Sequence, residues 1–198
     1  MQLKVILKWL AFIGAAVMVV SSVRIIFLPD AAAIKPTQSI ASVAQASLDA
    51  KLPVRLKIPS INVDAAIESL GLAPDGTMDV PNGPNDVAWF DLGPRPGEIG
   101  NAVMSGHFGW KDGISAVFDD LSTLKKGDIL FVEDSKGTTI AFVVRESRLY
   151  DPEADASDVF NSNDGKSHLN LVTCEGVWDE SSKSYSKRLV VFADKKIN

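Results

Sequence analysis

Cys174 is the only thiol in the chain, and it closes the apolar run LNLVTC. The N-terminal segment is typical of an exported protein, and exported proteins usually pair their cysteines in disulfides. A lone cysteine is therefore either a small buried apolar residue or a reactive nucleophile. A reactive thiol works with a general base and with donors that stabilise negative charge, so the histidines and arginines are its candidate partners.

The chain has two histidines that could act as the base, His107 and His168. If 167–174 is one strand, His168 and Cys174 share a face but lie about 20 Å apart, far beyond hydrogen-bond reach. We therefore expect His168 to be a surface residue at a strand end. His107 closes the run NAVMSGH, where a strand gives way to a loop, which is a common position for functional side chains. A histidine that merely ends a strand fits this position equally well.

Arg188 opens the run RLVVFA, and 13 residues separate it from Cys174. These residues, EGVWDESSKSYSK, are polar and typical of a loop. If the flanking runs pair as an antiparallel hairpin, Arg188 lies beside Cys174. An arginine is always charged and offers five donors, which can hold an oxyanion or a carbonyl oxygen. A solvated arginine at a strand end is the alternative.

Short β-like runs separated by turn residues must position these side chains. Eight are expected after residue 51, namely LPVRLKI, INVDAAI, GTMDV, NAVMSGH, DILFVED, TTIAFVVRESRLY, LNLVTC and RLVVFA. Turn signals such as Asp75-Gly76 separate them, and one short helix is expected around AVFDDLSTL. The pattern predicts an all-β domain, either a closed or nearly closed barrel or a sandwich, and argues against a βα-repeat fold.

The first 29 residues carry no acid, and an uncharged, largely apolar run covers 9–23. The segment 5–28 can cross a bilayer if Lys8 and Arg24 reach the headgroups. A cleaved signal peptide is the alternative, because the uncharged run has only 15 residues. We favour a retained transmembrane helix because apolar residues continue to the end of that segment. Both interpretations export the rest of the chain.

Composition divides the chain into a transmembrane anchor or signal segment (1–29), a linker rich in Ala, Ser and Gln (30–51) and one folded domain (52–198). Three of the 20 Lys and Arg residues precede residue 30, whereas all 25 Asp and Glu residues follow residue 29. The exported part therefore has 17 basic and 25 acidic residues, a formal charge of −8. This charge argues against nucleic acid as a partner.

Three motifs resemble those of the sortases, the cysteine transpeptidases of bacterial cell surfaces. VTCEG is similar to the family's Thr-x-Thr-Cys strand end, MSGHFGW to its Ala-Gly-His turn, and SKRLVVFA to the strand that opens with its essential arginine. The resemblance extends from about Leu56 to Ala193, and 56–107 is most similar to class F sortases. Asn170 departs from the family pattern, which usually has Thr there. Glu175 also departs, and its charge can raise the pKa of the neighbouring thiol.

The resemblance implies a single eight-stranded sortase-type β-barrel with Cys174, His107 and Arg188 as catalytic residues. Cys174 would attack a carbonyl of an LPxTG-like sorting signal and form a thioester. His107 would protonate the departing amine and later take a proton from the incoming one, while Arg188 would stabilise the oxyanion. The implied partners are the sorting signals of surface proteins and an amine of the cell wall or a pilin. The protein would be held in the bacterial cell membrane by a single span, with no cofactor.

Further residues near the expected site are candidates for substrate binding. Ser105 and Thr173 flank it, and Trp178 can line a peptide groove, although core packing is the more common fate of a tryptophan. The acidic segment 150–168 matches in position the sortase loop that shapes substrate choice. It lacks the glycine and terminal Glu of an EF-hand loop, so we expect a solvated loop without metal.

Two other functions fit part of the pattern. A non-catalytic extracytoplasmic β-barrel that binds a wall component would carry an inert, structural cysteine. An L,D-transpeptidase would also use a cysteine, but those enzymes carry His and Cys in one short motif. Here 67 positions separate His107 from Cys174.

Overall fold

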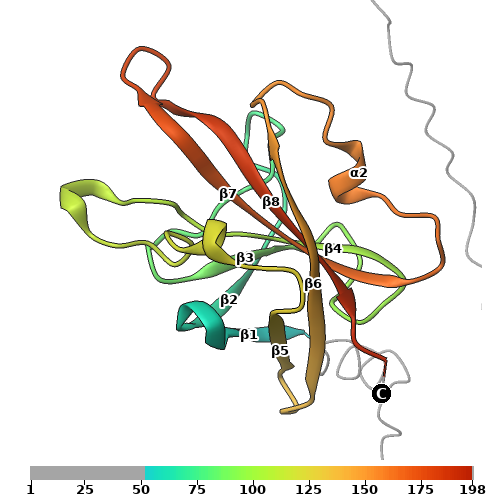
Figure 1. Cartoon of the computed structure of the whole chain (residues 1–198). Coiled ribbons are helices and arrows are strands. Elements are labelled where there is room, and N and C mark those ends of the chain that lie inside the picture. Colours follow the sequence, from blue (N-terminus) through green and yellow to red (C-terminus); the bar gives the residue numbers. More distant parts are fainter. Residues whose placement is uncertain (1–51, 198) are drawn as a thin grey trace, which may run out of the picture. The chain divides into compact units, whose positions relative to one another are not determined.

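The computed structural model describes residues 52–197, which form a closed barrel of eight strands (Figure 1). The strands are β1 (Pro53–Ile58), β2 (Val63–Leu70), β3 (Val87–Phe90), β4 (Gly100–Ser105), β5 (Ile129–Asp134), β6 (Thr139–Tyr150), β7 (Ser167–Asp179) and β8 (Ser184–Lys195). Their order around the barrel is β1-β2-β3-β4-β7-β8-β6-β5, and β5 pairs with β1 to close it. The prediction of an eight-stranded all-β domain is confirmed.

The helical elements are single turns. They are η1 (Pro59–Ile61), η2 (Lys111–Gly113), η3 (Leu121–Thr123) and the four-residue helix α2 (Ser157–Phe160). Within residues 52–197 no helix has the length and apolar character that a membrane span requires. The predicted transmembrane segment, 1–29, and the predicted linker, 30–51, lie outside the described residues.

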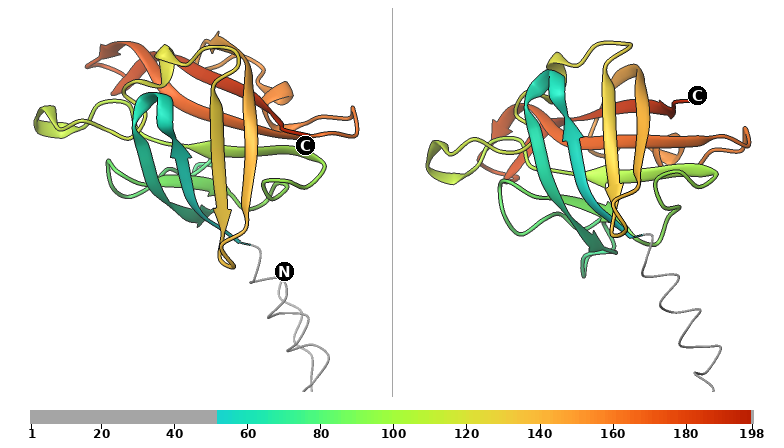
Figure 2. Two further views of the ribbon diagram at one scale, coloured as in Figure 1. Left: turned by 60° about the horizontal axis from the view of Figure 1, so that its bottom comes forward. Right: turned by 90° about the horizontal axis from the view of Figure 1, so that it is seen from below.

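The core fills the barrel with apolar side chains from all eight strands. Alternate residues of a strand point inward, and in β5 this leaves Leu130 and Val132 buried. Phe118 and Leu121, from the segment between β4 and β5, are fully buried in the same core. A smaller cluster, built around Val103, Val159, Val190 and Phe192, packs between α2 and the barrel wall. Figure 2 shows this barrel from two further directions.

Two predicted elements differ in the structure. GTMDV makes only an isolated bridge, between Leu72 and Met78, because the Asp75 carboxylate accepts hydrogen bonds from the amide and hydroxyl of Thr77 and turns the chain. The eighth strand is instead β3, a buried run without alternation that pairs parallel to β2 and antiparallel to β4. The helix expected around AVFDDLSTL is only the 3-10 turn η3.

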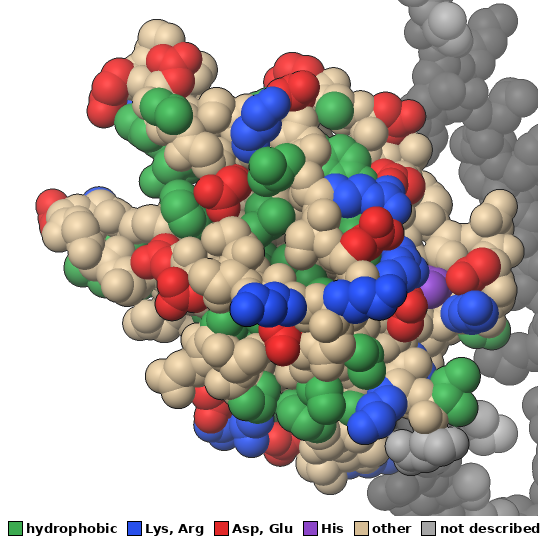
Figure 3. Space-filling model, viewed as in Figure 1, with side chains coloured by type: hydrophobic (Ala, Val, Ile, Leu, Met, Phe, Trp, Pro, Cys, Tyr) green, Lys and Arg blue, Asp and Glu red, His purple; other side chains and the backbone are tan. Residues whose placement is uncertain are grey.

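The face viewed in Figure 1 carries acidic and basic side chains next to each other (Figure 3). Arg148 pairs with Glu146 and with Asp158, and Arg145 pairs with Asp194. These pairs connect β6 to β8 and to α2. The basic side chains of this region are thus matched by acids.

Candidate active site

The hairpin of β7 and β8 places Cys174 directly opposite Arg188, as the hairpin hypothesis requires. Residues opposite each other in an antiparallel pair point to the same face of the sheet. The segment between them is not the loop that its polar composition indicated. Both strands continue past this pair, with a bulge at Gly176, and only 180–183 connects them. Polar residues suit these strands because this two-stranded extension is exposed to solvent (Figure 1).

His107 reaches the same end of the barrel because β4 runs parallel to β7, with Ser105 paired to Val172. The chain continues from β4 into Gly106, whose amide donates to the carbonyl of Val172. A Cβ on Gly106 would lie 2.5 Å from the ring of Phe118, so only glycine allows this close packing. The amide of Phe118 then donates to the carbonyl of His107, which fixes the start of the loop.

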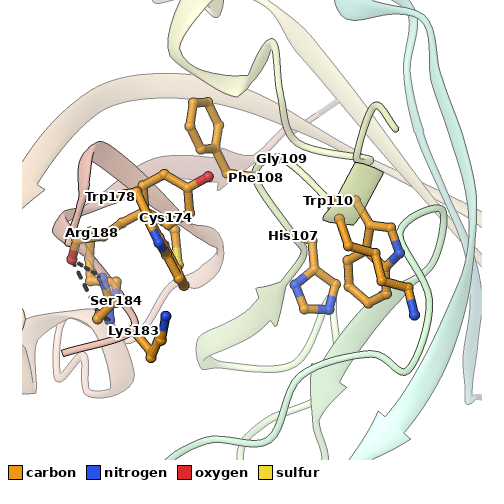
Figure 4. A pocket seen from close by; sticks show the side chains of 11 residues that line it. His107, Phe108, Gly109, Trp110, Cys174, Trp178, Lys183, Ser184 and Arg188 are labelled. Carbon is orange, nitrogen blue, oxygen red and sulfur yellow. Dashed lines mark hydrogen bonds between the residues drawn. The ribbon is translucent and has the colours of Figure 1, made fainter. Parts of the chain in front are cut away.

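The side chains of His107, Cys174 and Arg188 line one cavity of about 540 Å³. Figure 4 shows His107 on one side of this cavity and Cys174 with Arg188 on the other. The remaining lining comes from the loop after β4 and from the β7/β8 hairpin: Phe108, Gly109, Trp110, Lys111, Trp178, Lys183, Ser184 and Tyr185. We call this space the hairpin cavity.

A second cavity of about 300 Å³ adjoins the first and is lined by the same three side chains. Its other walls come mainly from 77–80, from the β6/β7 connection with α2, and from β7, and they are largely apolar. We call it the apolar cavity. Ser105 and Thr173 line the apolar cavity, whereas Trp178 lines the hairpin cavity.

Ser105 and Thr173 are both buried and use their hydroxyl protons within the protein. Thr173 donates to the carbonyl of Gly106 at 2.8 Å, and Ser105 donates to the carbonyl of Asp79 at 3.3 Å. Both bonds connect neighbouring walls of the apolar cavity. Trp178 is 43% exposed, and its indole donates to Glu180.

Cys174 is partly buried, and burial raises the pKa of its thiol above the ordinary value. The positive charge of Arg188 acts in the opposite direction and lowers this pKa. Burial, and not the charge of Glu175, causes this rise in the pKa of the Cys174 thiol. The expectation that Glu175 raises this pKa is therefore wrong. A thiol whose pKa is raised must give up its proton before it can act as a nucleophile.

One ring nitrogen of His107, Nε2, lies 2.8 Å from the carbonyl oxygen of Pro81. A carbonyl oxygen only accepts hydrogen bonds, so Nε2 carries a proton and donates it. In the neutral ring the other nitrogen, Nδ1, is then free to take a proton. Trp110 packs edge-on against the ring, with the centroids 4.6 Å apart. These contacts hold His107 in one orientation across the cavity from Cys174 (Figure 4).

The guanidinium of Arg188 is held by neutral acceptors. Its Nη1 donates to the carbonyls of Tyr185 and Lys187, and its Nη2 donates to the hydroxyl of Ser184, each at 3.0 Å. None of the carboxylates in residues 52–197 forms an ion pair with it. Its charge is therefore oriented and available to an oxyanion.

His168 is buried, with 5% of its surface exposed, so the prediction of a surface residue is wrong. Its Nδ1 lies 2.7 Å from Asp194 and its Nε2 lies 3.1 Å from Asp164. Carboxylates accept, so this arrangement suits a ring that donates from both nitrogens. The amide of Lys166, followed by His168, lowers the pKa of Asp164 well below its ordinary range. His168 has no nitrogen left to act as a base.

Two buried asparagines hold α2 against the barrel. Asn170, noted in the sequence only as a departure from the family pattern, donates to the carbonyl of Val159 at 2.7 Å. Asn101 donates to the carbonyls of Asp158 and Val159 at 2.9 and 3.2 Å. An asparagine inside an apolar strand run is the signal that could have found them, because a buried amide needs partners.

Comparisons with known proteins agree with this geometry. The chain matches the family described as the sortase domain over residues 56–196. Sortase A of Bacillus anthracis is 30% identical over 156 residues, which cover 78% of this chain and 65% of that protein. The chain thus spans slightly less than two thirds of that relative.

Two solved structures are also similar. Sortase C-1 from Actinomyces oris has a TM-score of 0.60 and 26% identity, covering 84% of this chain and 86% of that one. Group B Streptococcus pilus island 1 sortase C2 has a TM-score of 0.57 and 27% identity, covering 75% of each chain. Because the sortase match covers more than half of the sequence and includes His107, Cys174 and Arg188, the chain belongs to the sortase family.

Proposed function

We propose that this protein is a cysteine transpeptidase that cleaves an LPxTG-like sorting signal through a thioester on Cys174 and transfers it to an amine. The observation that carries the proposal is the position of His107, Cys174 and Arg188 between two adjoining cavities. A peptide in one cavity and an amine in the other would reach the same sulfur. Membership of the sortase family supports the same reaction.

In the first step, the sulfur of Cys174 attacks the carbonyl carbon of the peptide bond that is cleaved, and a C–S bond forms. The oxyanion accepts hydrogen bonds from Arg188, whose orientation is set by main-chain carbonyls. The C–N bond then breaks. The proton that the thiol releases passes through Nδ1 of His107 to the departing amine.

In the second step, the incoming amine attacks the thioester carbon. A C–N bond forms, the C–S bond breaks, and the proton of the amine passes to Nδ1 of His107 and from there to the sulfur. A thioester is reactive enough for this transfer, so the energy of the cleaved peptide bond is retained in the product.

We assign the apolar cavity to the sorting signal because the Leu and Pro side chains of that signal are apolar, as is the lining of the cavity. Ser105 and Thr173 would contribute to peptide binding by fixing the shape of the cavity wall. They would not donate hydrogen bonds to the peptide, since their hydroxyls already donate to main-chain carbonyls. Trp178 would contact substrate in the hairpin cavity. Among sortase classes we propose class F, on the resemblance of 56–107.

We further propose that 1–29 anchors the protein in the bacterial cell membrane by a single span, with the barrel outside the cytoplasm. The apolar run 9–23 and the absence of acids before residue 30 support this assignment. A substrate tethered to the same membrane would be searched for on a surface, which raises its effective concentration.

The test is to incubate the full-length chain with a library of LPxTG-like peptides and to measure acyl adducts on Cys174 by mass spectrometry. We expect an adduct with the wild-type protein, none with Cys174→Ala, and much slower formation with Arg188→Ala. Absence of an adduct with every peptide would favour the non-catalytic binding module. That module would also predict an inert thiol, whereas we expect rapid labelling of Cys174 by a small methanethiosulfonate.

A further inference from the structure

The hairpin cavity has aromatic walls that two separate segments build together. Phe108, after β4, meets Tyr185 of β8 edge-on with ring centroids 5.3 Å apart, and Trp178 packs on the same tyrosine at 5.2 Å. Gly109 has a φ of 64°, and a Cβ there would lie 2.8 Å from the Tyr185 hydroxyl. Glycine thus allows the loop to approach the hairpin. Aromatic walls of this kind bind the carbon skeleton of a small ligand.

The charged residues that line the hairpin cavity are all basic: Lys111, Lys183 and Arg188. Lys183 pairs with Glu180, which offsets its charge. Lys111 and Arg188 have no carboxylate partner among residues 52–197, and the ammonium of Lys111 lies 5.9 Å from the ring centroid of Trp110. These two unpaired cations contrast with the formal charge of −8 of the exported part.

We propose that the hairpin cavity selects an acceptor whose amine lies beside a carboxylate, and that Lys111 binds that carboxylate. This proposal rests on the proposed transpeptidase function. Arg188 is reserved for the oxyanion at Cys174, so Lys111 is the cation left for the acceptor. Trp110 and Trp178 contact the carbon skeleton of the acceptor from the two walls.

The charges of the cavity favour this acceptor for two reasons. An ammonium ion has no lone pair and cannot attack a thioester, and nearby cations lower the pKa of an amine and so favour its reactive neutral form. A carboxylate on the same molecule offsets the repulsion that a plain ammonium would meet on entering. An amine without a carboxylate also has its pKa lowered, but its charge is repelled when it enters the cavity. The cavity therefore selects the acceptor that carries a carboxylate.

Glycine and glycinamide are the probes that separate these effects, since they differ only in the group beside the amine. The full-length chain is first loaded with a sorting peptide, and the acyl-enzyme on Cys174 is measured by mass spectrometry. Each amine is then added, and the transfer rate with glycine is divided by the transfer rate with glycinamide. Comparing this ratio between wild type and Lys111→Gln cancels the intrinsic difference between the amines. Lys111→Arg keeps the charge, and Lys136→Gln is the matched control, exposed in a distant turn.

We expect the preference for glycine to be about fivefold larger in wild type than in Lys111→Gln, the value of one partly exposed ion pair. Lys111→Arg and Lys136→Gln should keep the wild-type ratio. Equal ratios in wild type and Lys111→Gln, or an acyl-enzyme that only hydrolyses with both amines, would overturn the acceptor proposal while leaving the thioester chemistry intact. Failure to form an acyl-enzyme with any peptide would overturn both.

Discussion

The two histidines of this domain lie at opposite ends of one pair of parallel strands. Where β4 and β7 begin, His168 is buried with a carboxylate on each ring nitrogen. Where the same strands end, His107 gives one nitrogen to the carbonyl of Pro81 and faces a cavity with the other (Figure 4). The partner of the second ring nitrogen therefore separates an imidazole with a structural role from one that can carry protons.

The charges around the two histidine rings also differ. Asp164 and Asp194 supply two negative charges around His168. The hairpin cavity beside His107 is lined by basic residues and no acid. Acids stabilise a positively charged ring, whereas the charge of Arg188 lowers the pKa of the Cys174 thiol and so favours its thiolate. The structural histidine and the candidate catalytic histidine thus lie at the two ends of the paired strands β4 and β7.

Among the tests of this comparison, we expect His107→Gln to change the rate of peptide transfer most. The variant loses the ring nitrogen that we propose moves protons, so we expect kcat/KM for peptide transfer to fall by about 10²- to 10⁴-fold. The urea midpoint should change little, because the ring is only partly buried. A variant that transfers peptide at the wild-type rate would contradict the assigned role of this ring.

Arg188→Gln removes the charge that faces Cys174, and we expect transfer to slow by about 10²- to 10³-fold. Arg188 lowers the pKa of the thiol, so its loss should raise that pKa further. The rate of methanethiosulfonate labelling should therefore rise with pH along a curve displaced to higher pH. Arg188→Lys serves as the comparison, since it keeps the charge. A labelling curve that does not move in the glutamine variant would show that the charge does not act on the sulfur.

His168→Gln should have the opposite profile to the change at His107. One buried ring with two charged hydrogen bonds is lost, and we expect the free energy of unfolding in urea to fall by about 2 kcal/mol. Labelling of Cys174 and transfer in the folded protein should stay within about twofold of wild type. A loss of transfer without a loss of stability would mean that both histidines take part in the chemistry.

The smallest expected effect comes from Asn170→Thr, which installs the residue usual in the family. The variant loses the hydrogen bond to the carbonyl of Val159 and so loosens α2 at the wall of the apolar cavity. We expect KM for the sorting peptide to rise about fivefold with kcat unchanged. Asn85→Thr, an exposed position away from both cavities, is the control. A fall in kcat alone would place the effect of Asn170 at the reacting atoms instead.

The sequence predicted most of the barrel because strands leave a local signature, a run of β-formers between turn residues. The same signature failed for GTMDV, where Asp75 turns the chain through its own side chain. It also missed β3, whose buried residues do not alternate. In the β7/β8 hairpin, the polar residues beyond Cys174 and Arg188 indicated a loop because an exposed strand has the composition of one.

The amino-acid sequence was enough to predict the chemical groups of the site, the position of His107 directly after a strand, the pairing of Cys174 with Arg188 in a hairpin, and the resemblance to the sortases. These follow from residue types and local order along the chain. The folded structure was needed to see that the three side chains line two adjoining cavities, that His168 is buried between carboxylates, and that Asn101 and Asn170 hold α2. Burial, pKa and hydrogen-bond partners depend on segments that are distant in sequence and meet only when the barrel closes.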